Sequence, residues 1–520
     1  MEKDWSLGIE LGSTRIKAVL IDKKHSVVAS GSSQWENRFE QGNWTYSLAD
    51  IHEKLRQCVA DLQDNVQEKL GKPLTQVGAI GISAMMHGYL AFDENWRLLV
   101  PFRTWRNTNT GAAAEELTAL FGQNIPQRWS ISHLYQAILR KEAHLEKLAH
   151  LTTLAGYIHY LLTGRFVLGV GDASGMFPVD DQGGYDRQMA AKFEALAKEK
   201  GYGVCLSEVL PKILFAGEGA GALTEEGARF LDPTGNLLPG AILCPPEGDA
   251  GTGMVATNAV QERTGNLSAG TSAFAMLVLE RSLKKLHREI DLVTTPHGKP
   301  VAMVHCNNCT GDLNGWAELF YTFAKSTGAD MSRDELFTFL FQKAMEGAAD
   351  CGGLLSYNYL SGEHVVGLSK GRPMFLRTES SEFTLPNFLR TLLYSALGAL
   401  RKGVDILQAE ENVAIDRLLG HGGFFKTPVV GQKIAAAVFR TPVSVMETAD
   451  QGGAWGIAIL ARYAALKDKP ELPSYLNEQV FAGMEVVTVQ PDAEDVQGFD
   501  AYFDRYVQTL PVQQAAGEYL

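Results

Sequence analysis

Two segments of the chain share a pattern of residues that could grip a phosphate group. Residues 7–22 and 265–280 each hold an apolar strand, a glycine with two hydroxyl residues, and a second apolar strand. The turns between the strands are Gly12-Ser13-Thr14 and Gly270-Thr271-Ser272. A glycine flanked by hydroxyl residues in a tight hairpin can direct backbone N–H groups and hydroxyls toward an anion. The repeat therefore predicts two related domains that face one nucleotide.

Two carboxylates beside glycine-rich segments could take part in phosphate chemistry. Glu10 precedes the first turn, where a carboxylate can hold Mg²⁺ directly or through water while the turn contacts a γ-phosphate. Asp249 lies between Gly248 and Ala250, at the start of a predicted helix. A carboxylate there can act as a general base that takes the proton of a sugar hydroxyl during attack on a phosphoryl group. Each position also has a plain interpretation, a surface glutamate on a hairpin and a helix N-cap.

Two shorter motifs follow predicted strands. Met86-His87-Gly88 comes after the predicted strand 75–83, where a lone Met-His is more often ordinary packing than a ligand site. Gly422-Gly423 follows the predicted strand 416–420, and glycines there would let the backbone approach a flat ring such as adenine. A simple strand-to-helix turn explains the second motif equally well.

The elements that must position these residues alternate between strands and helices in both halves of the chain. The hairpin over 6–22 continues into a predicted strand 26–33, and apolar residues at helical spacing predict a helix over 48–70. This alternation is typical of an α/β fold in which each half is a twisted sheet flanked by helices. The other predicted helices span 111–122, 134–149, 152–163, 187–201, 251–260, 311–326, 334–348, 384–410, 428–437 and 451–466.

The length of 520 residues allows two domains, each with a full hydrophobic core. The segment from Gly235 to Gly248 contains Pro245-Pro246 and is the predicted junction between them. The expected domains are therefore an N-terminal domain over 1–248 and a C-terminal domain over 249–520.

The composition argues against several classes of protein. A net charge of −13 disfavours binding to nucleic acid or to an anionic membrane, which need a basic face. The sequence has no run of about 18 apolar residues, so no membrane span is predicted. No signal peptide is visible either, so we expect a cytoplasmic protein. The six cysteines are too scattered for a disulfide scaffold. Cys306 and Cys309 form a lone CxxC pair, for which we expect a structural or incidental role.

Taken together and in order, the motifs resemble the FGGY family of carbohydrate kinases over nearly the whole chain. The resemblance implies the duplicated actin-like ATPase fold, with a central cleft for a nucleotide. Its specificity comes from the order and spacing of the motifs and not from any single one. The matching segments include GIELGSTRIKAVLID, AIGISAMMHG, GYIHYLLTG, GDASGMFPVD, EGDAGTGMV, NLSAGTSAF, YLSGEH, LLGHGGFFKTPVVGQKIA and QGGAWGIAILA.

The resemblance also implies roles for individual residues, with ATP and Mg²⁺ as cofactors. Asp249 matches the catalytic base of the family, and it would also lie near the metal. Glu10 stands where the family usually has Asp, near Mg²⁺ and the phosphates, so the metal geometry must shift or a water must be lost. The residues implied in nucleotide binding are Gly12, Ser13, Thr14, Lys17, Gly270, Thr271, Ser272, Gly311, Gly422 and Gly423.

Substrate recognition is implied by two further stretches. Met86, His87 and Gly88 match the Met-His-Gly stretch that touches the sugar in xylulose kinases, which favours a ketopentose such as xylulose. Trp105, Arg106 and Asn107 stand in a sugar-facing loop, where xylulose kinases tend to show Trp-Asn-Asp-x-Arg. The Arg position of that pattern is Asn109 here, and Arg106 is new. A kinase for another sugar or polyol, such as ribulose, gluconate or a glycerol-like compound, is therefore an alternative.

Two further alternatives come from other functional classes. An ATPase similar to actin or Hsp70 would share the twin hairpins without phosphorylating a sugar. A binding protein that has lost catalysis would retain both ligands, although the Asp249 motif argues against it. For the kinase we expect a small-molecule sugar as partner, no nucleic acid and no membrane, and a homodimer as in many relatives.

Overall fold

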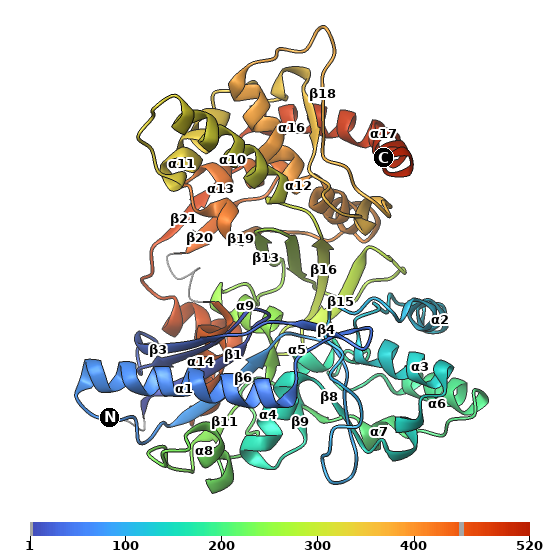
Figure 1. Cartoon of the computed structure of the whole chain (residues 1–520), viewed down its shortest axis with the longest axis vertical. Helices are drawn as coiled ribbons and strands as arrows, with labels where there is room; N and C mark the ends of the chain where they lie inside the picture. Colours follow the sequence, from blue (N-terminus) through green and yellow to red (C-terminus); the bar gives the residue numbers. More distant parts are fainter. Residues whose placement is uncertain (1–3, 447–451) are drawn as a thin grey trace.

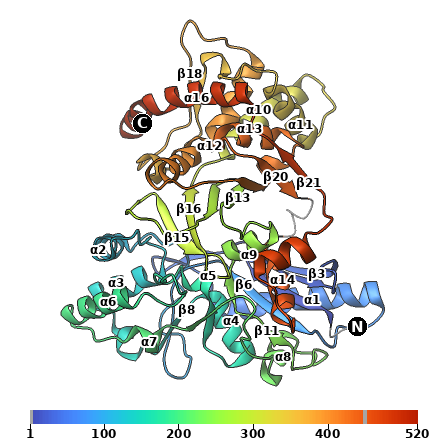
Figure 2. The same cartoon turned by 180° about the vertical axis from the view of Figure 1, so that it is seen from behind.

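The chain folds into two lobes, each built around one mixed β-sheet (Figure 1). The computed structural model describes residues 4–446 and 452–520. In both views the first sheet lies in the lower lobe, and the second sheet lies above it with α10 to α13, α16 and α17 (Figures 1 and 2). None of the helices in these described ranges is long and apolar enough to cross a membrane.

The first sheet has the strand order β11-β6-β1-β2-β3. An antiparallel meander of β1, β2 and β3 is extended by β6, which runs parallel to β1. Two short strands, β11 and β12, then pair in parallel with β6. The strands are β1 (Ser6–Leu11), β2 (Arg15–Ile21), β3 (Val27–Gln34), β6 (Ala79–Ala84), β11 (Ile242–Leu243) and β12 (Glu247–Gly248).

The second sheet repeats this plan in the order β15-β16-β14-β13-β19-β20-β21. Its hairpin β13–β14 is antiparallel, β16 pairs antiparallel with β14, and β19 and β20 extend the sheet in parallel. The predicted duplication is therefore present in the strand pairing itself. The strands are β13 (Thr264–Ala269), β14 (Ala273–Val278), β15 (Ile290–Thr294), β16 (Pro300–Cys306), β19 (Arg417–His421), β20 (Val443–Met446) and β21 (Val486–Val489).

Helices cover the sheets, and most lie where the periodicity predicts them. For example, α1 starts at the N-cap Ser47, ends at Gly71 in the left-handed conformation, and packs on β3. The helices are α1 (Leu48–Leu70), α2 (Gly111–Phe121), α3 (Ser130–Arg140), α4 (Leu154–Thr163), α5 (Val170–Ala173), α6 (Arg187–Glu199), α7 (Leu206–Val209), α8 (Glu225–Leu231), α9 (Asp249–Ala256), α10 (Gly311–Ser326), α11 (Arg333–Ala344), α12 (Leu385–Glu410), α13 (Val430–Phe439), α14 (Gly452–Ala464), α15 (Leu472–Tyr475), α16 (Ala493–Gln508) and α17 (Leu510–Tyr519).

Short strand pairs complete the described part of the chain. Several of them are buried and contribute side chains to the hydrophobic cores, such as Leu90 and Phe92 of β7 and Tyr357 of β17. These strands are β4 (Arg38–Glu40), β5 (Asn43–Thr45), β7 (Leu90–Phe92), β8 (His150–Thr152), β9 (Val167–Gly169), β10 (Lys212–Leu214), β17 (Leu355–Tyr357) and β18 (Met374–Leu376).

Two differences from the sequence-based expectation have simple physical causes. The helix predicted over 134–149 ends at Arg140, because Lys141 adopts the left-handed conformation. The predicted junction 235–248 contributes two strands to the first sheet. Each strand has only two residues, which is too short to give a recognisable pattern in the sequence. Gln451, the first residue of the helix predicted over 451–466, lies outside the described residues.

Helix α14 packs against β1, β2 and β6 of the first sheet, although it lies within the sequence range expected for the second domain. It is apolar except for Arg462 in its last turn, and nearly every residue is buried. Glycines let its backbone come close, since a Cβ on Gly8 would lie 2.1 Å from the Ala454 carbonyl oxygen. A Cβ on Gly81 would similarly lie 2.6 Å from the Ile457 carbonyl.

The variant Gly8→Ala should test this close contact. The added methyl group meets rigid backbone of α14, so we expect the free energy of unfolding to fall by at least about 2 kcal/mol. Chemical denaturation of the purified variant measures the change. Gly219→Ala is the matched control, because Gly219 is exposed and has no atom within 4 Å of the added Cβ. Equal stabilities of the two variants would contradict the described packing of α14.

Candidate active site

The ends of three parallel strands gather the predicted catalytic residues at one edge of the first sheet. In the register, Glu10 of β1 pairs with Ser83 of β6, which pairs in turn with Glu247 of β12. Asp249 follows β12 directly and begins α9. Its Oδ1 accepts hydrogen bonds from the backbone N–H groups of Met86 (3.3 Å) and Ala250 (2.9 Å). The structure thus joins the predicted base to the predicted sugar-binding segment.

The side chain of Glu10 is held by the N-terminal turn of α14. Its Oε2 accepts a hydrogen bond from the Ala454 N–H at 3.1 Å, where the helix dipole favours a negative charge. A Cβ on Gly453 would lie 2.5 Å from the Glu10 Oε1, so only glycine leaves room for this carboxylate. Lys17 lies opposite Glu10 in the hairpin register, and its positive charge opposes the rise in the Glu10 pKa.

Glu10 and Asp249 are buried acids that influence each other. Burial raises the pKa of Asp249 to about 6. Burial and the nearby charge of Asp249 together raise the pKa of Glu10 to about 7. A cation between two such carboxylates would relieve their repulsion, so the pair fits a site for Mg²⁺. Among the described residues, no group of three or more His, Cys, Asp or Glu side chains is arranged to hold a metal, so phosphate and water oxygens would have to complete the shell.

Two further acids, Glu247 and Asp172, lie beside this pair. Glu247 accepts hydrogen bonds from the N–H groups of Gly171 (3.3 Å) and Asp172 (2.9 Å). The strand before α5 leaves space for it, because a Cβ on Gly169 would lie 2.2 Å from the Glu247 Oε1. Burial raises the pKa of Glu247 to about 8 and that of Asp172 to about 7.

The environment of Asp172 is unusual for a carboxylate. Its Oδ2 accepts a hydrogen bond from the Thr153 hydroxyl at 2.6 Å. Its Oδ1 is buried and has no hydrogen-bond partner in the part of the chain that the structure describes. Sequence reasoning gave no role to Asp172 or Glu247. The available signal was an acid in an apolar stretch beside glycine, since Asp172 stands alone in VLGVGDASGMF and Glu247 stands two residues before Asp249 in CPPEGD.

The segment Met86-His87-Gly88 forms a tight bend after β6. His87 and Gly88 both have positive φ (69° and 87°). The ring of His87 is buried, its Nδ1 lies 3.0 Å from the Gly175 carbonyl oxygen, and it stacks near Trp129. Burial lowers the pKa of His87 to about 3, so the imidazole is neutral at physiological pH. The bend is therefore a rigid, neutral surface next to Asp249.

The predicted sugar loop Trp105–Asn107 packs on the β4–β5 hairpin. Asn107 is buried, and its amide makes three hydrogen bonds of 2.8–2.9 Å to the backbone of Trp44 and Thr104. The guanidinium of Arg106 lies 3.9 Å from the centre of the Trp44 ring. Trp105 is half-buried against the core of the first lobe. These contacts give Asn107 a structural task, because its polar atoms are already used.

The first predicted phosphate turn is held by two stacked aromatic rings. Trp35 donates its indole N–H to the Gly12 carbonyl (2.7 Å), and the Tyr46 hydroxyl donates to the Ser13 carbonyl (2.5 Å). The two rings stack with their centres 4.3 Å apart. The backbone N–H of Trp35 also donates to the Thr14 carbonyl. The carbonyl oxygens of the turn are therefore occupied by the protein.

The second predicted phosphate turn is held by the loop that precedes α10. Both the N–H and the hydroxyl of Thr310 donate to the Gly270 carbonyl (2.9 and 2.8 Å), and the Cys309 N–H donates to the Thr271 carbonyl (3.0 Å). Gly311 follows as the first residue of α10. The structure thus brings the turn and Gly311 together.

The Gly422-Gly423 pair lies beside this second turn. Gly422 has φ of 97°, and a Cβ there would lie 2.6 Å from the Ala269 carbonyl oxygen, next to Gly270. A Cβ on Gly423 would meet no atom within 4 Å, so its surroundings are open. The predicted nucleotide residues of the second lobe therefore share one edge of the second sheet.

A pH series of Asp172→Asn should test the buried acids. Because the pKa of Asp172 is raised in the folded state, its protonated form stabilises the fold. This stabilisation is fully present below the ordinary aspartate pKa of 3.8 and is lost as pH rises through about 7. The amide keeps the shape and the bond to Thr153 but cannot ionise. We therefore expect melting temperature to fall less steeply between pH 4 and pH 7 than in the wild type. Asp468→Asn, at an exposed position, should follow the wild-type slope. Parallel curves for Asp172→Asn and the wild type would contradict the assigned burial.

Models of the two domains of the FGGY family of carbohydrate kinases match the chain over residues 5–232 and 265–465. A xylulose kinase from Haemophilus influenzae is 25% identical over 528 residues, which cover 97% of this chain and 99% of that protein. The crystal structure of a xylulose kinase from Rhodospirillum rubrum has a TM-score of 0.79 at 20% identity, covering 98% of this chain and 99% of that one. A gluconate kinase from Lactobacillus acidophilus has a TM-score of 0.78 at 18% identity, with 99% of each chain covered.

The structural neighbours share the actin-like ATPase fold, which agrees with the duplicated sheets described above. The family models cover both lobes in the expected order. The protein is accordingly a phosphotransferase with an alcohol group as acceptor, and the chain belongs to the FGGY family of carbohydrate kinases.

Proposed function

We propose that this kinase transfers the γ-phosphate of ATP to a hydroxyl of a ketopentose such as xylulose, with Asp249 as the general base. The observation that carries the proposal is the contact between Asp249 and Met86. It ties the acid that opens α9 at this edge of the first sheet to the segment expected to touch the sugar. Xylulose kinases among the relatives support the choice of sugar.

The chemistry asked of Asp249 is modest and suits its surroundings. As the sugar oxygen attacks the γ-phosphorus, the new O–P bond forms, the bond to the ADP oxygen breaks, and Asp249 takes the hydroxyl proton. A pKa of about 6 leaves the carboxylate mostly ionised at neutral pH and makes it a stronger base than an ordinary aspartate. The N–H groups of Met86 and Ala250 orient its Oδ1.

The remaining residues bind and position the two substrates. The turn Gly270–Ser272, Gly311 and the Gly422-Gly423 pair would hold ATP on the second lobe, and Gly12–Thr14 with Lys17 would approach its phosphates from the first. Glu10 and Asp249 would hold Mg²⁺, which when bound neutralises phosphate charge. A closed arrangement of the lobes around both substrates would exclude water and limit wasted ATP hydrolysis.

A kinase for another sugar or polyol is the second candidate, because kinases that act on different sugars share this fold. The gluconate kinase matches this chain as well as the xylulose kinase structures do. The buried amide of Asn107 leaves the half-buried Trp105 and the exposed Arg106 as the residues of this loop most available to choose a sugar. An ATPase that acts without a sugar would have no need of the neutral bend next to Asp249.

An ADP-release assay with ATP and Mg²⁺ across a panel of ketoses, aldoses and polyols tests the proposal. We expect one ketopentose to stimulate turnover strongly. Asp249→Asn should lower kcat by about 10²–10⁴-fold, because the proton acceptor is lost, while ATP affinity stays near the wild-type value. The exposed variant Asp468→Asn should keep full activity.

Other results would overturn parts of this proposal. Near-normal turnover in Asp249→Asn would remove Asp249 from the role of base. Stimulation by an aldose or a polyol alone would retain the kinase and replace the sugar. ATP turnover that ignores every sugar would favour an ATPase similar to actin or Hsp70.

A further inference from the structure

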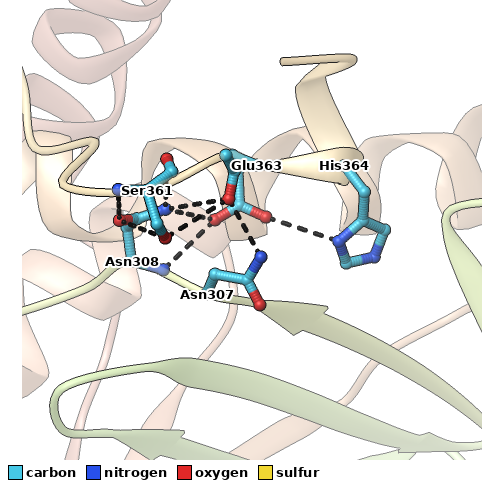
Figure 3. Close-up of polar contacts among 6 residues, drawn as sticks. Asn307, Asn308, Ser361, Glu363 and His364 are labelled. Atoms are coloured by element: carbon cyan, nitrogen blue, oxygen red, sulfur yellow. Dashed lines mark hydrogen bonds and ion pairs between the residues drawn. The ribbon is translucent and has the colours of Figure 1, made fainter. Parts of the chain in front are cut away.

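A buried polar cluster in the second lobe centres on Glu363 (Figure 3). The side chain of Glu363 is fully buried. Its Oε2 accepts hydrogen bonds from the backbone N–H of Asn308 (3.2 Å) and from the Asn308 side-chain amide (3.1 Å). Its Oε1 makes no hydrogen bond within the described residues, and the ring nitrogen Nδ1 of His364 lies 3.7 Å away.

The loop that carries Glu363 is fastened to the loop before α10 at several other points. The Ser361 N–H donates to the Asn308 Oδ1 (3.0 Å), and the Asn307 amide donates to the Gly362 carbonyl (2.9 Å). The Asn358 amide donates to the Cys309 carbonyl at 2.8 Å. Residues 358–363 thus hold residues 307–309 from one side.

The next residues along the chain carry the second phosphate turn. Cys309 and Thr310 donate their backbone N–H groups to the carbonyls of Thr271 and Gly270. The side chain of Leu360 packs over Gly311, where a Cβ would lie 2.9 Å from its Cδ1. Asn308 is therefore one residue away from the groups that fix the turn.

Burying a carboxylate is unfavourable unless its partners compensate, and Glu363 uses only one of its two oxygens fully. Burial raises its pKa to about 7, despite the hydrogen bonds from Asn308. An apolar side chain could fill the same space without this penalty but could not hold Asn308. The contribution of Glu363 is thus to hold Asn308 in place.

We infer that Glu363 is a positioning residue for the phosphate donor, which acts through Asn308 to hold the turn Gly270–Ser272 and the start of α10 in their nucleotide-binding arrangement. The inference rests on the proposed binding of ATP by this lobe. Glu363 touches neither substrate directly in this scheme. It acts on nucleotide affinity and leaves the sugar side, in the other lobe, unchanged.

Calorimetry with ADP and Mg²⁺, without any sugar, measures the effect directly. Loss of buried hydrogen bonds to a charged group should weaken ADP binding by Glu363→Ala by about tenfold or more. In steady-state kinetics the KM for ATP should rise by a similar factor while the KM for the sugar stays within about twofold. Glu363→Gln keeps an acceptor for the Asn308 N–H and should recover most of the affinity. Glu379→Ala, at an exposed position of the same lobe, is the matched control.

A double-mutant cycle with Asn308→Ala separates this role from a general loss of stability. Because the two residues act in one chain of contacts, the double variant should bind ADP about as weakly as either single variant. Additive losses would overturn the inference, as would wild-type ADP affinity in folded Glu363→Ala. If Glu363→Ala fails to fold, Asn308→Ala and Glu363→Gln carry the test alone, and wild-type ADP affinity in Asn308→Ala would overturn it. A wild-type protein that binds no ADP would overturn the proposed function as well, which distinguishes the two failures.

Discussion

The close packing of α14 on the glycines of the first sheet is the constraint on which the candidate active site depends. Because Gly8 and Gly81 let the helix backbone come into contact, its first turn reaches the end of β1 and holds Glu10. The same helix packs on α9, which begins with Asp249. One helix, distant in sequence from both acids, therefore fixes the depth at which they are buried. That depth accounts for the raised pKa of each.

Burial of acids recurs through the molecule and is linked each time to a backbone segment that must keep its shape. Glu247 binds the N–H groups at the start of α5, Glu10 binds α14, and Glu363 binds the loop before α10. Carboxylates suit this task because each offers acceptors on both oxygens and can serve backbone N–H groups that no strand or helix satisfies. In each case the buried acid fixes the shape of a backbone segment.

Much of the fold could be predicted from sequence, because periodicity and glycine-rich turns are local signals. The two hairpins, α1, α10 and α12 lie within a residue or two of the predicted ranges. The two turns and Gly422 are predicted individually from the sequence, and the family resemblance implies that they bind one nucleotide. Asp172, Glu247 and Glu363 could not be assigned in this way, since their importance comes from glycines and amides brought close only by folding. The structural task of Asn107 was hidden for the same reason, because Trp44 lies 63 positions away.

The position of α14 also determines how this chain could be divided. A fragment that ends before residue 249 would retain β1 and β6 but would leave the glycine-lined face of its sheet exposed to water. A fragment that begins at residue 249 would retain the contact between α14 and α9 but would expose the side of α14 that packs on the first sheet. Two such pieces, produced together, would tend to associate, because each would bury the apolar surface that the other exposes. A division of the chain at its midpoint therefore does not correspond to a boundary in the folded structure.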